Sequence, residues 1–217
     1  TLSVDGETTE VDSWYGNRDH SWGIRASMGP HIPLRGTEGT RGDPRAIRIW
    51  LPFEVGDHTG FFSLHEDADG RRLDFDGMLM DASGTVTELR TAEHRFEYVE
   101  GSSRLRSGEF TLVDEDGEKY EYSFEVVGEP GSPQGYGYVR GWADGDPPGS
   151  WRGPEHLEHD RFDVSDPHSV AGPPHVAVGR RLGTCEYPAV VTSASGETGM
   201  AQIEHMVYGT YHPYGFA

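Results

Sequence analysis

The chain has 217 residues, of which 37 are acidic and 18 are basic, so its formal net charge at pH 7 is −19. This charge argues against nucleic acid as a partner, because contact with phosphates needs a basic surface. No run of about 18 apolar residues is present, so no membrane-spanning helix is predicted. The single cysteine, Cys185, excludes an intrachain disulfide.

The composition favours a loop-rich β protein, with 30 glycines, 14 prolines and 34% hydrophobic residues. No basic region followed by an apolar stretch opens the chain, so we expect no secretory signal and a cytoplasmic location. Because the sequence begins at Thr1 rather than at methionine, we also expect a trimmed chain, a processed chain or a fragment, from which an N-terminal partner domain could be missing.

Alternating patterns predict strands through the first half of the chain. Residues 1–11 predict a hairpin that turns at Asp5-Gly6, a dipeptide typical of two-residue turns. After a loop rich in glycine, proline and arginine, four more strands are predicted over 46–55, 59–67, 71–81 and 85–99.

Two further hairpins follow, separated by a long segment without periodicity. Residues 104–127 predict a hairpin around Asp116-Gly117, and residues 187–209 predict another around Ser195-Gly196. The segment 128–174 is crowded with proline, glycine, aspartate and tryptophan. We expect it to be a long loop or lid that covers the barrel mouth or a partner face.

Eight to ten strands in consecutive hairpins favour closure, which removes exposed sheet edges. The predicted fold is therefore all-β: one domain over residues 1–217 that forms a single antiparallel up-and-down β-barrel of about eight to ten strands with one long loop. We expect less than about 10% helix, since no window keeps a helical apolar stripe.

The stretch "GNRDHSWGIR" (16–25) gathers ionisable groups around an indole. If it is extended, Arg18, His20 and Trp22 share one face, while Asp19 and Arg25 share the other. An arginine beside Asp19 would hold this carboxylate ionised, so the sequence favours an Asp19–arginine pair over a neutral acid.

Two interpretations of this motif stay open. As a scaffold, Asp19 and Arg25 fix the strand entry, Trp22 plugs the barrel end, and Gly16 and Gly23 allow close backbone approach. As a site, His20 is the acid–base group, Asp19 orients it, and aromatic walls stabilise a developing cation. The residues predicted to supply those walls are Trp14, Trp22, Trp50, Phe53, Tyr98 and Tyr122.

The residues Asp19, His20, Ser21, Trp22 and Gly23, followed by a β-meander, resemble the Asp-His-(Ser/Asn/Gln)-Trp-Gly motif of the carotenoid 1,2-hydratase-like (CrtC/AttH) superfamily. That family has two lipocalin-like barrels, and this chain resembles the second. The resemblance implies a lipocalin-like fold, an absent first barrel and a proton-donor role for Asp19. Since an open barrel interface rarely stays exposed, we expect a homodimer or a partner barrel.

Other polar groups are weaker candidates. Glu204 and His205 are adjacent in a predicted strand, so one of them must point inward and line the barrel. His156 and His159 with neighbouring carboxylates could hold a divalent metal on a helical turn, but the solvated acidic turn is favoured and no metal site is predicted.

The leading functional hypothesis is a hydratase-like enzyme domain that needs no cofactor. It would hydrate, dehydrate, isomerise or cyclise an apolar, alkene-containing small molecule. The alternative is a non-catalytic lipocalin-like domain that binds an apolar ligand or a partner barrel. A buried ionisable group that faces a cavity would favour the enzyme, since a carrier needs only an apolar cavity.

Overall fold

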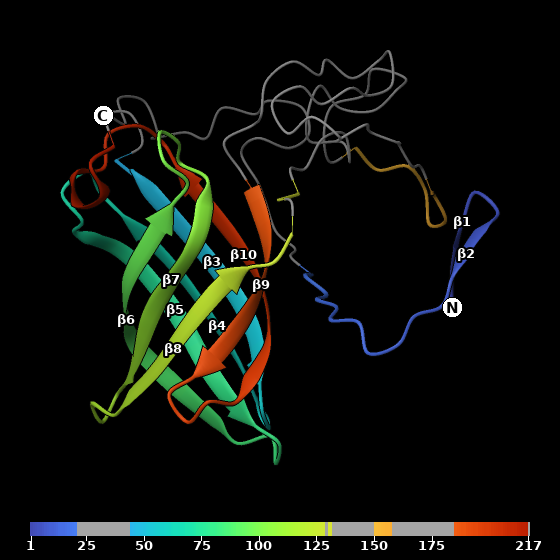
Figure 1. The fold of residues 1–217 in the computed structure, drawn as a ribbon, viewed down its shortest axis with the longest axis horizontal. Coiled ribbons are helices and arrows are strands. Elements are labelled where there is room, and N and C mark those ends of the chain that lie inside the picture. Colours follow the sequence, from blue (N-terminus) through green and yellow to red (C-terminus); the bar gives the residue numbers. More distant parts are fainter. Residues whose placement is uncertain (21–43, 129, 132–149, 158–184, 217) are drawn as a thin grey trace.

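Eight antiparallel strands close into one barrel in this computed structural model, which describes residues 1–20, 44–128, 130–131, 150–157 and 185–216 (Figure 1). The barrel strands are β3 (Ile47–Val55), β4 (His58–Glu66), β5 (Arg72–Asp81), β6 (Val86–Tyr98), β7 (Leu105–Asp114), β8 (Lys119–Val126), β9 (Cys185–Ser193) and β10 (Thr198–Val207). Each strand pairs with the next along the chain, and β10 pairs with β3 to close the ring. The prediction of an all-β antiparallel barrel of eight to ten strands is confirmed.

The N-terminal hairpin is also confirmed, and it forms a sheet of its own. β1 (Leu2–Val4) pairs with β2 (Glu7–Thr9), and Figure 1 shows this hairpin beside the barrel rather than within it. Asp5 and Gly6 have φ values of 52° and 83°. Positive φ at both central residues is what a tight two-residue hairpin turn requires.

One turn design recurs between the barrel strands. The sequences "DADGR" (67–71), "DASGT" (81–85) and "DEDGE" (114–118) each begin with an aspartate whose carboxylate accepts hydrogen bonds from the backbone N–H groups two and four residues later. The glycine of each turn has a φ between 77° and 89°, a conformation that favours glycine. These turns fix where one strand ends and the next begins.

Inward-facing aromatic side chains fill the barrel. Phe53, Phe110 and Tyr122 lie with their ring centroids 4.9–5.5 Å apart near the middle and one end of the barrel. Phe96 contacts Phe124 at 5.2 Å further along. Because side chains alternate along each strand, the same pattern that buries these rings sends their neighbours to the outer face.

The C-terminal residues close the other end of the barrel. A short 3₁₀ helix, η1 (His212–Tyr214), follows β10, and Tyr211 pairs with Phe216 in an isolated bridge. The backbone N–H of His212 donates to the carbonyl of Ala68 at 2.9 Å, which ties this segment to the end of β4. Tyr211 is fully buried as a result.

η1 is the one helix among the described residues, and none of these residues forms a helix long and apolar enough to span a membrane. Most of the predicted lid at 128–174 lies outside the described residues. Gly131, which is described, pairs with Glu186 beside β9.

The seam between β10 and β3 offers a test of barrel closure. A methyl group on Gly199 would overlap the carbonyl oxygen of Glu54, so Gly199→Ala should lower the free energy of unfolding by about 1–3 kcal/mol. Gly16→Ala is the control, because nothing lies within 4 Å of its added methyl, and it should change stability by less than about 0.5 kcal/mol. Urea unfolding followed by circular dichroism measures both. Equal stabilities would contradict the tight seam.

Candidate functional site

Buried and half-buried polar side chains gather at the barrel end that the C-terminal segment covers. Four come from strands and two from the segment after β10, and all but one carry an aromatic or imidazole ring. We call this group the polar cluster: Glu66, His94, Tyr98, His205, Tyr211 and Tyr214.

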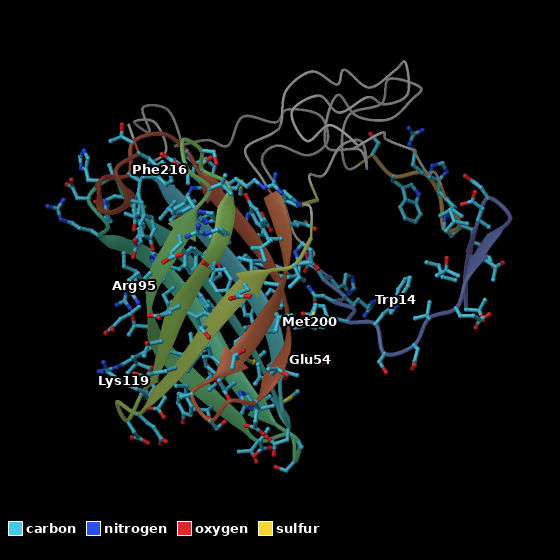
Figure 2. The ribbon with its side chains drawn as sticks, in the orientation of Figure 1. Trp14, Glu54, Arg95, Lys119, Met200 and Phe216 are labelled. Atoms are coloured by element: carbon cyan, nitrogen blue, oxygen red, sulfur yellow. The ribbon has the colours of Figure 1, made fainter. Side chains whose placement is uncertain are left out.

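Strand alternation and barrel closure place these side chains together. His94 and Tyr98 flank the inward-facing Phe96 on β6, and His205 faces inward from β10. Glu66 is the last residue of β4. The cluster therefore lies where four elements converge, and Figure 2 shows Phe216 of the C-terminal segment at this same end.

Polar contacts join three members into a continuous series, and Tyr211 joins it at Glu66. The Tyr214 hydroxyl lies 2.6 Å from His94 Nδ1, and His94 Nε2 lies 3.4 Å from Glu66 Oε2. Tyr211 donates its hydroxyl proton to the same carboxylate oxygen of Glu66. The Tyr214 oxygen also accepts the backbone N–H of Phe96 at 2.9 Å.

The Glu66 side chain is held as a carboxylate. Burial would raise the pKa of Glu66, but the hydrogen bonds from His94 and Tyr211 outweigh burial and hold its pKa below the ordinary value. Burial raises the pKa of Tyr214 to about 12, so this residue is a neutral phenol near pH 7. The chain thus runs from a phenol through an imidazole to a carboxylate.

The partners of His94 define where its protons lie. An ionised carboxylate can only accept hydrogen bonds, so the Nε2 that faces Glu66 carries a proton. In the neutral ring, Nδ1 then accepts the Tyr214 hydroxyl. In the protonated ring, Nδ1–H donates to the Tyr214 oxygen, whose own proton can turn to the His94 carbonyl 3.4 Å away. The Tyr214 hydroxyl can therefore serve His94 Nδ1 either as donor or as acceptor.

A second pair, Tyr98 and His205, lies beside this chain. His205 Nδ1 is 3.2 Å from the carbonyl of Arg48, which can only accept, so Nδ1 carries the proton and Nε2 accepts the Tyr98 hydroxyl at 2.9 Å. Burial lowers the pKa of His205 to about 3, which keeps it neutral at physiological pH. This pair is a fixed neutral contact rather than a proton acceptor.

A surface cavity of about 620 Å³ opens above the cluster. Tyr98, Tyr214 and Phe216 form its aromatic part, and Glu100 and Ser102 of the β6–β7 turn contribute polar groups. A cavity of this size is within the range of small-molecule sites. Two members of the polar cluster thus line a cavity.

A smaller cavity of about 250 Å³ lies at the opposite end of the barrel. His58 Nε2 is 2.9 Å from the Tyr122 hydroxyl there, and both residues line the cavity. Burial raises the pKa of Tyr122 to about 12. The carboxylate nearest to His58, that of Asp57 at 3.8 Å, is exposed to solvent, whereas Glu66 of the polar cluster is half-buried.

The N-terminal motif lies outside the barrel as far as it is described. Arg18, Asp19 and His20 are exposed, and Asp19 lies close enough to β9 to act on Glu186. Burial together with the Glu204 and Asp19 charges raises the pKa of that glutamate. The remaining motif residues, Trp22, Gly23 and Arg25, fall outside the described residues.

The other predicted site residues lie on the inner face of the barrel wall, on its outer face, or on the N-terminal segment. His205, Tyr98 and Tyr122 face inward, and the first two belong to the polar cluster. Trp50 and Glu204 lie on the outer face, where Glu204 pairs with Arg48 at 3.2 Å. Trp14 is exposed on the N-terminal segment (Figure 2).

Sequence reasoning missed Glu66, His94, Tyr211 and Tyr214. His94 sits in a run where alternate residues are apolar, and an ionisable residue at an inward position is a detectable signal. Tyr211 and Tyr214 offered no such signal, because they lie beyond the last strand. Among the described residues no group of three or more potential ligands could hold a metal ion. His156 of the weak metal candidate is exposed, and His159 is not described.

Comparison with known proteins assigns the chain to a family but gives it no activity. A family model described as "Family of unknown function (DUF8625)" matches residues 1–217. A search of the curated proteins found no match.

The buried His205 should make stability depend on pH. Its pKa of about 3 in the folded state lies below the ordinary value of 6.5, so the unfolded chain binds the extra proton between these values. Its contribution to stability is complete above about pH 6.5 and is lost as pH falls toward 3, with a slope of at most about 1.4 kcal/mol per pH unit. His205→Gln should remove this part of the pH dependence of the unfolding free energy. Urea titrations between about pH 4 and about pH 7 measure it, because the His205 proton is gained or lost on unfolding over roughly this range.

His212→Gln is the matched control, because His212 is exposed beside Asp69. This variant should keep the pH dependence of the unfolding free energy that His205 contributes. A His205→Gln slope equal to that of the parent would contradict a neutral, buried His205.

Proposed function

We propose that this chain, which belongs to the family of unknown function DUF8625, is an acid–base enzyme domain that needs no cofactor and acts at the polar cluster. Its substrate would be an apolar small molecule with a hydroxyl or carbonyl group next to a double bond. The reaction would be hydration, dehydration or isomerisation. The observation that carries the proposal is the chain Tyr214–His94–Glu66 beneath a cavity that Tyr214 lines.

The series Tyr214–His94–Glu66 can move a proton without creating a free phenolate. A substrate hydroxyl gives its proton to the Tyr214 oxygen as the Tyr214 proton passes to His94 Nδ1. The resulting imidazolium lies 3.4 Å from the Glu66 carboxylate, which stabilises its charge. The reverse transfer delivers a proton to a leaving hydroxyl or to a carbonyl oxygen. The proton that leaves carbon in dehydration or isomerisation passes to solvent water, and its return from solvent in the reverse direction places a solvent hydrogen on carbon.

The nature of the acid narrows the substrate class. A phenol with a pKa of about 12 is too weak to protonate an unactivated alkene, but it can exchange protons with oxygen. The cavity combines aromatic side chains with serine hydroxyls and Glu100, and the net charge of −19 disfavours anionic ligands. A neutral molecule with an oxygen function beside its double bond fits these conditions.

The resemblance of residues 16–25 to the carotenoid 1,2-hydratase-like superfamily agrees with this reaction class but predicts other residues. Under that hypothesis Asp19 and His20 carry the chemistry. The two hypotheses can be separated, because Asp19 and His20 are exposed on the N-terminal segment whereas the members of the polar cluster are buried or half-buried at the barrel end.

The alternative function is a non-catalytic binding domain. One observation favours it: the members of the polar cluster already hydrogen-bond to one another and to backbone groups. Such a satisfied network can simply seal a barrel end. A binding domain would hold a ligand in the same cavity without exchanging protons with it.

Solvent deuterium separates these functions. The protein should be incubated in D₂O with a panel of apolar allylic alcohols and conjugated ketones, and carbon-bound deuterium should be followed by mass spectrometry. Tyr214→Phe and Glu66→Gln should each slow incorporation by about 100-fold or more, while Asp19→Asn and His20→Ala should leave the rate unchanged. Circular dichroism melts would verify that each variant is folded.

Other outcomes have distinct meanings. Loss of incorporation in Asp19→Asn or His20→Ala alone would move the site to the N-terminal motif. Ligand binding by the parent protein without any incorporation would support the binding domain.

A further inference from the structure

One side of the outer barrel wall carries large apolar side chains instead of the usual polar ones. Met78 and Met80 on β5 and Val86 on β6 are 44%, 40% and 46% exposed. Outward positions of an antiparallel sheet normally face water with polar residues. Three exposed apolar side chains on neighbouring strands therefore need an explanation.

Strand register makes these side chains part of one continuous face. Met78 is paired with Phe61 of β4, and Met80 is paired with Val86. Trp50 of β3 contacts Phe61 with ring centroids 5.5 Å apart. We call this surface the methionine face: Trp50, Pro52, Phe61, Met78, Met80 and Val86.

Three unpaired acidic residues border the methionine face, and Arg48, beside Trp50 on the same side of β3, is paired with Glu204. Glu54, Asp76 and Glu88 are exposed and lie beside it in the strand register. None of them forms an ion pair with a basic side chain of the described residues. The apolar face is thus bordered by uncompensated negative charge.

The rest of the barrel wall differs from this side. On β6 and β7 several outward charges form ion pairs, as in Arg95–Glu109 at 2.7 Å, and Lys119 of β8 lies 3.8 Å from Glu93. Glu121 and Glu125 of β8 are also exposed. Figure 2 shows Arg95 and Lys119 on the side of the barrel away from Glu54. Ion pairs thus offset much of the acidic charge on β6 and β7, whereas Glu54, Asp76 and Glu88 have no such partner among the described residues.

We propose that the methionine face docks a protein segment that presents apolar side chains flanked by lysine or arginine. Flexible, polarisable methionine side chains suit a surface that adapts to a partner, and the acidic border selects a basic one by charge complementarity. A second copy of this chain would place two acidic borders against each other. A basic amphipathic partner meets both the apolar and the charged parts of this face.

The proposal is independent of the polar cluster, which lies inside the barrel. The probe is a synthetic amphipathic peptide of leucine and lysine, with a leucine–glutamate peptide of equal length as its counterpart. Protein labelled with ¹³C at the methionine methyl groups reports the contact directly. The Met78 and Met80 signals should shift with the lysine peptide, and that of the buried Met206 should not.

Two variants sharpen the test. The double variant Met78→Lys/Met80→Lys should weaken binding of the lysine peptide at least tenfold. Glu121→Lys makes the same change in net charge at an exposed position on β8, and it should reduce affinity by less than threefold. Affinity for the lysine peptide should also fall as salt rises, because the acidic border is exposed to screening.

Three results would overturn the proposal. The first is equal binding of both peptides, and the second is equal loss of affinity in the double variant and in Glu121→Lys. The third is a concentration-dependent dimer in analytical ultracentrifugation that the double variant abolishes, since the occupant would then be a second copy.

Discussion

Pairing of β10 with β3 is the contact on which the other features of this protein depend. It joins the last strand to the first barrel strand and leaves no edge strand in the ring. Closure also defines an interior that side chains must fill, which explains the column of aromatic rings from Phe53 to Phe124. The close approach of Gly199 to Glu54 at this seam shows how little space the pairing leaves.

The polar cluster follows from the same closure. Toward one end of the barrel the apolar filling gives way to Glu66, His94 and His205, and the C-terminal tyrosines cover them. Buried polar groups are stable only when they are paired, so each member needs the strands of its partners. The network is thus a property of the closed barrel, and whatever chemistry it supports is confined to this end.

Local patterns in the sequence predict the strands and turns but only part of the site. Alternation along β10 required either Glu204 or His205 to face inward, and the structure buries His205. No local pattern could join His94 to Tyr214, since these residues are 120 positions apart and meet only after closure. Conversely, the conspicuous run from Arg18 to His20 is exposed, because clustering of ionisable residues in sequence does not determine on which side of a wall they lie.

The order of the strands also has a consequence for how the chain folds. From β3 to β8 every pairing joins neighbours across a short turn, three of them organised by an aspartate, so these hairpins need little loop closure and can form early. The pairings of β8 with β9 and of β3 with β10 are different, because each brings together segments far apart in the chain, such as Val126 with Ala189 and Ile47 with Val207. The entropy of closing these long loops falls on the last steps. Without these two pairings, β3 to β8 would be an open six-stranded sheet with two unpaired edges, which closure of the barrel removes.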